Sequence, residues 1–286
     1  MRGQTKESSL TEAKSQLHRL GARAKKGLGQ HFLIDRSVLD RIISAAELVS
    51  SDTVIEIGPG LGILTEELLK EAGKVIAIEV DSKLASSLEK KLSKSPRLTV
   101  LNADVLQLDP RELLESQRNY KVVANLPYYI AAPILRHFLE ASLKPSLMVV
   151  MVQKEVGQSI AAAPGDMSIL GISVQLYGKP TIVDYVPAQS FYPQPKVDSA
   201  IVRIDVYPKP AVDVADIEGF FEIVKAGFSA PRKQIRNSLA LGLQLTSAEV
   251  VELLEQAGIT PQRRPETLSL GEWANLHRIV ASKDIK

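Results

Sequence analysis

The chain has 286 residues, 45% of them hydrophobic and 24% charged, an ordinary globular composition with enough apolar material for one large or two modest domains. The net charge of +2 gives no argument for nucleic-acid binding from the total alone, and no run of about 18 apolar residues predicts a membrane span. The absence of cysteine excludes disulfides, thiolate metal ligands and cysteine nucleophiles and fits a reducing compartment, and four scattered histidines have no metal-binding spacing.

The first 29 residues are basic, with seven Lys or Arg against two Glu, and we assign residues 1–24 to a basic N-terminal extension. A second basic block, residues 225–248, has four Lys or Arg and no acid. Two such blocks can flank a phosphate backbone, but the charges alone favour a solvated surface and a loose tail. The two acids of the first block, and the Gly-Gln-His-Phe-Leu segment after it, argue against an organellar transit peptide. We expect a cytoplasmic protein.

Short apolar runs alternate with amphipathic stretches up to about residue 205. Most of the runs are β-branched and continuously hydrophobic, as in a sheet covered on both faces. The predicted strands are Thr53–Gly58, Lys74–Glu79, Leu98–Asn102, Tyr120–Asn125, Leu147–Val152, Thr181–Val186 and Ala200–Asp205. The predicted helices among them are Asp35–Leu48, Ile63–Glu71, Ser82–Leu92, Ala132–Leu143, Lys154–Ala163 and Ser168–Tyr177. This alternation predicts an α/β fold with a doubly wound sheet.

The pattern changes after Tyr207-Pro208-Lys209-Pro210, which is typical of a linker. The periodicity beyond it is helical, and Gly and Pro residues separate the helices. The predicted helices are Ile217–Ala226, Lys233–Leu241, Ser247–Gln256 and Leu270–Ala281. We therefore predict a catalytic domain over residues 25–207 and a small all-helical domain over residues 211–286.

A glycine-rich loop follows the first long strand, with the sequence Gly58-Pro59-Gly60-Leu61-Gly62 before a helix. Glycines at this place allow a tight turn and a close backbone approach to a ligand at the helix N-terminus. Pro59 removes an amide that a pyrophosphate would use, and Ile63 breaks the spacing of a dinucleotide-binding loop. The loop therefore favours a methyl-donor cofactor without phosphate.

Acidic residues follow the next two strands. Glu79 ends its strand 21 residues after Gly58, where a carboxylate suits a bidentate hydrogen bond to two ribose hydroxyls. Asp104 follows the third strand, where a carboxylate can accept a hydrogen bond from the amino group of a cofactor adenine, or can cap the next turn. We favour the ligand role for both residues.

The segment Asn125-Leu126-Pro127-Tyr128 closes the fourth strand and suits the binding of a planar amine. The Asn125 side-chain oxygen and the Leu126 carbonyl can accept both hydrogens of an NH2 group, which aims its lone pair at the methyl donor that the glycine loop favours. Pro127 stiffens the turn, and Tyr128 offers a flat stacking face. Because the methylated nitrogen is cationic and acidic, no dedicated base is needed.

Together, these motifs make the chain resemble the KsgA-type ribosomal RNA adenine N6-dimethyltransferases, also called RsmA. The resemblance covers about Lys25 to His277. The matching segments are Gly29-Gln30-His31-Phe32-Leu33, Glu56-Ile57-Gly58-Pro59-Gly60-Leu61-Gly62, Asn125-Leu126-Pro127-Tyr128, Phe191-Tyr192-Pro193-Gln194-Pro195-Lys196-Val197-Asp198-Ser199 and Arg236-Asn237-Ser238-Leu239. The resemblance implies a Rossmann-like fold that binds S-adenosylmethionine.

The resemblance also implies roles for single residues. S-adenosylmethionine would be bound by His31, Leu33, Gly58, Glu79, Asp104 and Asn125. The target adenine would be contacted by Asn125, Leu126, Pro127, Tyr128 and Phe191, with Tyr128 and Phe191 sandwiching the base and Phe191 presented at the surface. The chain departs from the family at His31, where many members carry Asn, and before Arg236, where the basic run is shorter.

By resemblance, the substrate is a pair of adjacent adenosines in the 3′-terminal hairpin loop of 16S rRNA, presented in an immature 30S subunit, and each adenosine would receive two methyl groups. We expect a monomer with no membrane association and no metal. Three alternatives stay open: an Erm-type 23S rRNA methyltransferase, a DNA adenine methyltransferase, and a non-catalytic RNA-binding assembly or transcription factor on the same fold. Arg236-Asn237-Ser238-Leu239 and Arg264-Pro265-Glu266-Thr267-Leu268 resemble the KsgA type more than the Erm type.

Overall fold

The computed structural model describes residues 2–20, 30–114, 117, 119–230 and 232–283, with the backbone alone for residues 2–9. The chain divides into two compact units. The first comprises residues 1–158 and 179–206, and the second comprises residues 159–178 and 207–286. Domain boundaries at residues 25–207 and 211–286 stay a proposal. None of the described helices is long and apolar enough to cross a membrane.

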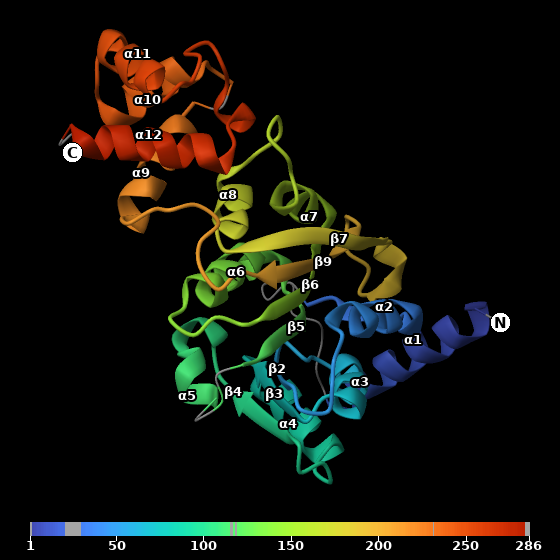
Figure 1. Ribbon diagram of the computed structural model, residues 1–286. Helices are drawn as coiled ribbons and strands as arrows, with labels where there is room; N and C mark the ends of the chain where they lie inside the picture. The colour runs from blue at the N-terminus through green and yellow to red at the C-terminus, as the bar shows by residue number, and fades with distance from the viewer. Residues whose placement is uncertain (1, 21–29, 115–116, 118, 231, 284–286) are drawn as a thin grey trace. The chain divides into compact units, whose positions relative to one another are not determined.

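The first unit is built on a seven-stranded sheet in the order β4-β3-β2-β5-β6-β9-β7 (Figure 1). The neighbouring pairs from β4 through β6 are parallel, and β9 runs antiparallel to β6. The strands are β2 Thr53–Ile57, β3 Lys74–Glu79, β4 Leu98–Asn102, β5 Lys121–Asn125, β6 Leu147–Gln153, β7 Gly178–Val186 and β9 Ser199–Val206. The order reverses at β2, which places a ligand crevice beyond the carboxyl ends of β2 and β5.

Helices connect the strands of the first unit. They are α2 Arg36–Ala46, α3 Ile63–Glu71, α4 Ser82–Lys91, α5 Pro110–Leu114, α6 Ala131–Glu140 and α7 Lys154–Ile160, the last of which runs into the second unit. The predicted strands and helices are confirmed as elements, with ends that shift by a few residues. Continuous hydrophobicity identified the strands because β2 and β6 are buried almost throughout.

A second, two-stranded sheet was not predicted from the sequence. It pairs β1 Phe32–Leu33 antiparallel with β8 Phe191–Tyr192, so that Leu33 lies opposite Phe191. Helical turns at Val105–Gln107, Tyr128–Ile130 and Ala188–Ser190 also follow strands. The small sheet brings the Gln-His-Phe-Leu segment, residues 30–33, beside the loop that contains Pro193.

The N-terminal extension forms helix α1, Arg2–Arg19, so the expectation of a loose tail is wrong for this part of the chain. Its buried side chains Ala13 and Leu17 pack in a cluster with Phe32, Leu61 and Leu84. This hydrophobic packing explains why the segment is helical, because most helical stability in proteins comes from the packing of an apolar face. The remaining extension residues, 21–24, lie outside the described residues.

The second unit is helical. Its helices are α8 Ile169–Gln175, α9 Ile217–Gly227, α10 Ile235–Leu243, α11 Ser247–Gln256 and α12 Leu270–Ser282, with a 3-10 turn at Pro265–Thr267. Trp273 is fully buried and stacks on Phe228, with ring centroids 5.8 Å apart. A side chain at Gly227 would meet the Trp273 ring at 2.3 Å, so the helices pack too closely there for any residue but glycine.

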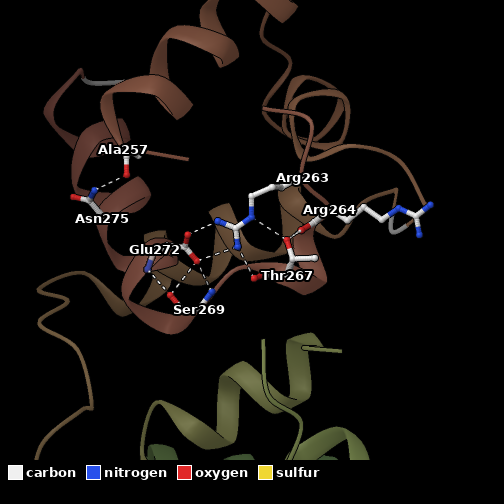
Figure 2. A network of polar contacts seen from close by, with 7 residues as sticks. All are labelled: Ala257, Arg263, Arg264, Thr267, Ser269, Glu272 and Asn275. Carbon is white, nitrogen blue, oxygen red and sulfur yellow. Dashed lines mark hydrogen bonds and ion pairs between the residues drawn. The ribbon is translucent and has the colours of Figure 1, made fainter. Parts of the chain in front are cut away.

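A polar network holds the segment before α12 (Figure 2). The Arg263 guanidinium binds the Glu272 carboxylate and donates to both oxygens of Thr267. Glu272 also forms a capping box with Ser269 at the start of α12. Arg263 is therefore a structural residue, whereas the side chain of Arg264 extends away from this network (Figure 2).

Candidate functional site

A cavity of about 250 Å³ lies beyond the carboxyl ends of β2, β3, β4 and β5 in the first unit. It is lined by residues from β1, from the glycine loop and from the segments that follow the strands. The predicted site residues that line it are His31, Leu33, Gly58, Glu79, Asp104, Asn125 and Pro127. The structure thus gathers all six proposed cofactor residues at one cavity, although they come from five separate segments of the chain.

The glycine loop forms one wall and adopts a conformation that its glycines permit. Gly58, Gly60 and Gly62 all have positive φ, at 65°, 57° and 82°. Two of its backbone amides form hydrogen bonds within the protein: the Gly58 N–H donates to Ile78 O at 2.9 Å, and the Gly60 N–H donates to the Glu79 carboxylate at 3.1 Å. The loop is therefore tied to the end of β3, as a binding surface of defined shape requires.

The Glu79 carboxylate is 5% exposed and lies at the end of β3. One oxygen accepts from Gly60 N–H and the other accepts from Asp81 N–H at 3.0 Å. Burial raises the pKa of Glu79, while these backbone hydrogen bonds oppose the rise. Each carboxylate oxygen retains acceptor capacity, so the group is oriented for a vicinal diol such as a ribose.

Glu56 is a cavity residue that sequence reasoning did not assign to the site. It is 1% exposed, and its Oε2 has no hydrogen-bond partner among the described residues. Burial raises the pKa of Glu56 to about 8. A buried carboxyl that lines a cavity and has one oxygen without a partner fits a ligand that donates a hydrogen bond, and its place just before the glycine loop was the available signal.

Asp104 combines the two roles that the sequence left open. Its side chain accepts from the Leu106 N–H at 3.0 Å and so caps the turn Val105–Gln107. It also lines the cavity. A carboxylate that uses one oxygen as a cap still has acceptor capacity for an amino group.

Asn125 ends β5 at the rim of the cavity, and its amide is oriented by the N-terminal segment. The Nδ2 atom donates to His31 O at 3.2 Å. This contact leaves Oδ1 as an acceptor. The Leu126 N–H donates to Met151 O at 3.1 Å, which holds the Asn125–Leu126 peptide in place, and the Leu126 side chain is buried. The Asn125 amide and the backbone that leads to the Leu126 carbonyl are therefore both anchored by main-chain contacts.

Tyr128 is half-buried and does not line the cavity. Its hydroxyl shares a hydrogen bond of 2.7 Å with the Ser199 hydroxyl, and its ring stacks on His31. Tyr129, the next residue, lines the cavity and is 54% exposed. Sequence reasoning missed Tyr129; its only signal was a second aromatic residue after the motif.

Phe191 is 2% exposed, so the expected surface presentation is wrong. The residue pairs with Leu33 in the small sheet, and its side chain packs in the same core cluster as Leu33, Val38 and Ile201. Alternation along β8 accounts for the difference, because it turns Phe191 inward and leaves Tyr192 half-buried. The structure thus gives Phe191 a packing role.

The cavity fits S-adenosylmethionine by the chemistry of its donor set. The carboxyl groups of Glu79, Asp104 and Glu56 line the cavity and can accept hydrogen bonds, and S-adenosylmethionine offers ribose hydroxyls, an adenine amino group and an ammonium group as donors. The site brings these acceptors together around glycines that have no side chain to fill the space. Among the described residues, no group of three or more His, Cys, Asp or Glu could hold a metal ion.

Comparison with known proteins supports this interpretation. The family model described as ribosomal RNA adenine dimethylase matches residues 21–282. Ribosomal RNA small subunit methyltransferase A of Dehalococcoides mccartyi is 49% identical over 269 residues, which cover 94% of this chain and 92% of the relative. The protein of the same name from Clostridioides difficile is 42% identical over 282 residues, covering 96% of this chain and 97% of the relative.

Two solved structures share the fold over most of the chain. A dimethyladenosine transferase from Plasmodium falciparum superposes with a TM-score of 0.75 at 27% identity, covering 89% of this chain and 99% of the other. The 23S rRNA methyltransferase ErmE superposes with a TM-score of 0.68 at 30% identity, covering 87% of this chain and 99% of the other.

Proposed function

Because the chain belongs to the ribosomal RNA adenine dimethylase family, we propose that it transfers methyl groups from S-adenosylmethionine to the N6 atoms of adenosines in small-subunit rRNA. The finer proposal concerns two adjacent adenosines in the 3′-terminal hairpin loop of 16S rRNA, each converted to N6,N6-dimethyladenosine. The methylation of an amine is supported by the Asn125 amide, whose Nδ2 is held by His31 O at 3.2 Å beside the cavity. The choice of small-subunit rRNA is supported by the names of the relatives and not by this contact.

Adenine N6 is a weak nucleophile because its lone pair is delocalised into the ring. Asn125 Oδ1 and the Leu126 carbonyl accept its two hydrogens, which favours a pyramidal nitrogen and directs the lone pair into the cavity. Bound S-adenosylmethionine supplies an electrophilic methyl group on sulfur. Orientation is the main contribution of the protein, since the product nitrogen is cationic and loses its proton to water without a dedicated base.

The cofactor would be held by the residues whose positions fit it. We propose that Glu79 binds the ribose hydroxyls and that Asp104 binds the adenine amino group. The glycine loop at Gly58, His31 and Leu33 would form the remaining walls of the cofactor site. After the first transfer N6 keeps one hydrogen, so only one of the two acceptors stays engaged. The site must then accommodate a methyl group where the other hydrogen bond was.

The target base must leave its stack before it can reach the cavity. Tyr128 and the exposed Tyr129 are the aromatic residues of this turn that can support it, and Pro127 holds the turn stiff. We propose an immature 30S subunit as the partner and a monomeric enzyme acting in the cytoplasm, where ribosomal RNA is assembled.

The test measures tritium transfer from S-adenosylmethionine to 30S subunits of an under-methylated strain, to purified 23S rRNA and to duplex DNA. We expect transfer to the 30S subunit and two adjacent dimethyladenosines when the products are mapped. The Asn125→Ala variant should lose about 100-fold in kcat, as expected when a reacting group is misoriented, and should still bind S-adenosylhomocysteine in calorimetry.

A second candidate follows from the likeness to ErmE at 30% identity. The same experiment separates the two, because an Erm-type enzyme would label 23S rRNA in preference to the 30S subunit. A wild-type rate for Asn125→Ala would overturn the amine-orientation mechanism while leaving the substrate assignment intact.

A further inference from the structure

Helix α1 packs against the outside of the cofactor cavity. Its residues Ala13 and Leu17 are buried in one cluster with Phe32, Leu61 and Leu84. The last three residues also line the cavity. The side chains that form the inner wall of the site are thus backed by a helix that precedes every proposed cofactor residue in the chain.

One polar contact from α1 reaches the glycine loop itself. Gln16 Nε2 donates to the Leu61 carbonyl at 3.3 Å, and Lys91 Nζ, at the end of α4, donates to the same oxygen at 3.2 Å. Lys91 is in turn paired with Glu66 of α3 at 2.7 Å. The Leu61 carbonyl is therefore held from two sides by donors that lie outside the loop.

The Leu61–Gly62 peptide affects the shape of the loop because the residues on both sides of it are conformationally constrained. Gly60 and Gly62 have positive φ, and a Cβ on Gly62 would lie 2.5 Å from Leu88. The Gly62 N–H, in the same peptide as the Leu61 carbonyl, donates to Pro59 O at 2.9 Å. A rotation of the Leu61–Gly62 peptide would break this turn and move Gly60 away from Glu79. Backbone in such regions persists only when its surroundings determine it.

The helix also contacts the small β1–β8 sheet. Lys14 Nζ lies over the Tyr192 ring, 5.3 Å from its centroid. Tyr192 belongs to β8, which pairs with β1, the strand that brings Phe32 and Leu33 to the cavity. Helix α1 therefore bridges the glycine loop and the small β1–β8 sheet.

We propose that Gln16 is a positioning residue for the cofactor loop and that helix α1, through it, increases the affinity for S-adenosylmethionine. This inference rests on the proposed function because it concerns the same cofactor site. Gln16 acts through the Leu61–Gly62 peptide and lies outside the cavity lining. Its effect therefore falls on cofactor binding and not on the orientation of the adenine.

The test begins with three variants of the full chain, and Lys91→Met is added to it alone and in combination with Gln16→Met. Gln16→Met removes the donor but keeps the side-chain length and the helix propensity. Gln16→Lys restores a donor at the same place. Ser15→Met introduces the same new side chain one residue away, on the exposed face of α1. Calorimetry gives the Kd for S-adenosylhomocysteine, and steady-state kinetics on 30S subunits give kcat and the KM for S-adenosylmethionine.

For Gln16→Met we expect a Kd and a KM for the cofactor about fivefold higher, the effect of one hydrogen bond, with kcat at saturating cofactor unchanged. Gln16→Lys should recover most of the loss, and Ser15→Met should match the wild type. In Gln16→Met/Lys91→Met the loss should exceed the sum of the single effects, because the two donors share one acceptor.

Equal affinities for wild type and Gln16→Met would overturn the inference and leave the proposed function standing. A loss in Gln16→Met that Gln16→Lys does not recover, with a lower melting temperature and a lower kcat, would show a purely structural helix and would also overturn it. Failure of the wild type to bind S-adenosylhomocysteine would instead refute the proposed cofactor site.

Discussion

The imidazole of His31 stacks on the ring of Tyr128, with centroids 5.6 Å apart and planes inclined by 26°. His31 Nδ1 donates to Pro193 O at 2.7 Å, and His31 O accepts from Asn125 Nδ2. One residue of the N-terminal segment thus contacts both ends of the Asn125–Tyr128 turn and the loop after β8. Because the imidazole covers one face of Tyr128, a target base can stack only on the other face.

The support that the His31 ring gives to Tyr128 can be tested by replacing His31 with the non-aromatic Asn. His31→Asn removes the ring that supports Tyr128. We expect kcat/KM for the 30S subunit to fall about fivefold, the value of an aromatic pair. His31→Phe keeps an aromatic ring and loses the contact with Pro193, so its kcat/KM should lie between those of the wild type and His31→Asn. An unchanged kcat/KM in His31→Asn would show that Tyr128 needs no support.

Tyr129 is expected to stack on the RNA, because it lines the cavity and is 54% exposed. Tyr129→Ala should weaken binding of an under-methylated 30S subunit by about 1–3 kcal/mol, the value of base–aromatic stacking, without a change in melting temperature. The matched control is Tyr185→Ala, which removes another tyrosine, 42% exposed, from β7. Equal binding by both variants would exclude Tyr129 from the RNA interface.

Much of the fold could be predicted because the main sheet has continuous apolar strands. Each of these apolar strands ends at or just before a glycine or a polar residue, such as Gly58, Glu79 or Asn125. Because the strands are parallel, these residues meet at one edge of the sheet. The cavity therefore contains the six residues predicted to bind the cofactor. Strand ends were sufficient for Gly58, Glu79, Asp104 and Asn125, which end or closely follow strands, whereas His31 and Leu33 were predicted from the family resemblance.

Other parts of the site depend on contacts distant in sequence. Strands β1 and β8 have two residues each, too few to show a period, so the sequence did not reveal their pairing or which way Phe191 points. Helix α1 is polar over most of its length, and only its packing on Phe32 and Leu61 distinguishes it from a tail. The unpartnered state of Glu56 is likewise a property of the folded environment.

Replacing Phe191 should mainly lower the stability of the protein, because its side chain is part of the core. It is 2% exposed in a core cluster with Leu33 and Ile201. Phe191→Ala should lower the free energy of unfolding by about 3–5 kcal/mol, the cost of truncating a buried aromatic side chain, as measured by urea denaturation. Phe191→Leu, which fills more of the cavity, should lose less. If Phe191→Ala were as stable as the wild type but inactive, the stacking role inferred from the sequence would be restored.

Glu56 makes the stability of the protein depend on pH in a defined direction. Burial raises the pKa of Glu56 from 4.5 to about 8 in the folded chain. Below pH 4.5 the carboxyl is protonated in both the folded and unfolded states, so its ionisation does not lower the free energy of unfolding. Between pH 4.5 and 8 the unfolded chain releases this proton while the folded chain keeps it. The contribution of Glu56 to stability is therefore lost as the pH rises, and above pH 8 the loss is complete.

Glu56→Gln keeps the shape of the side chain and removes this ionisation. We expect the stability of the variant relative to the wild type to increase with pH between 5 and 8, with a slope of up to about 1.4 kcal/mol per pH unit. Urea denaturation at pH 5, 6.5 and 8 measures the difference, in which the other titrating groups cancel. Glu89→Gln, on the exposed face of α4, is the control and should show no pH-dependent difference from wild type. A difference for Glu56→Gln that stays constant from pH 5 to 8 would show that the buried carboxyl is already ionised in the folded protein.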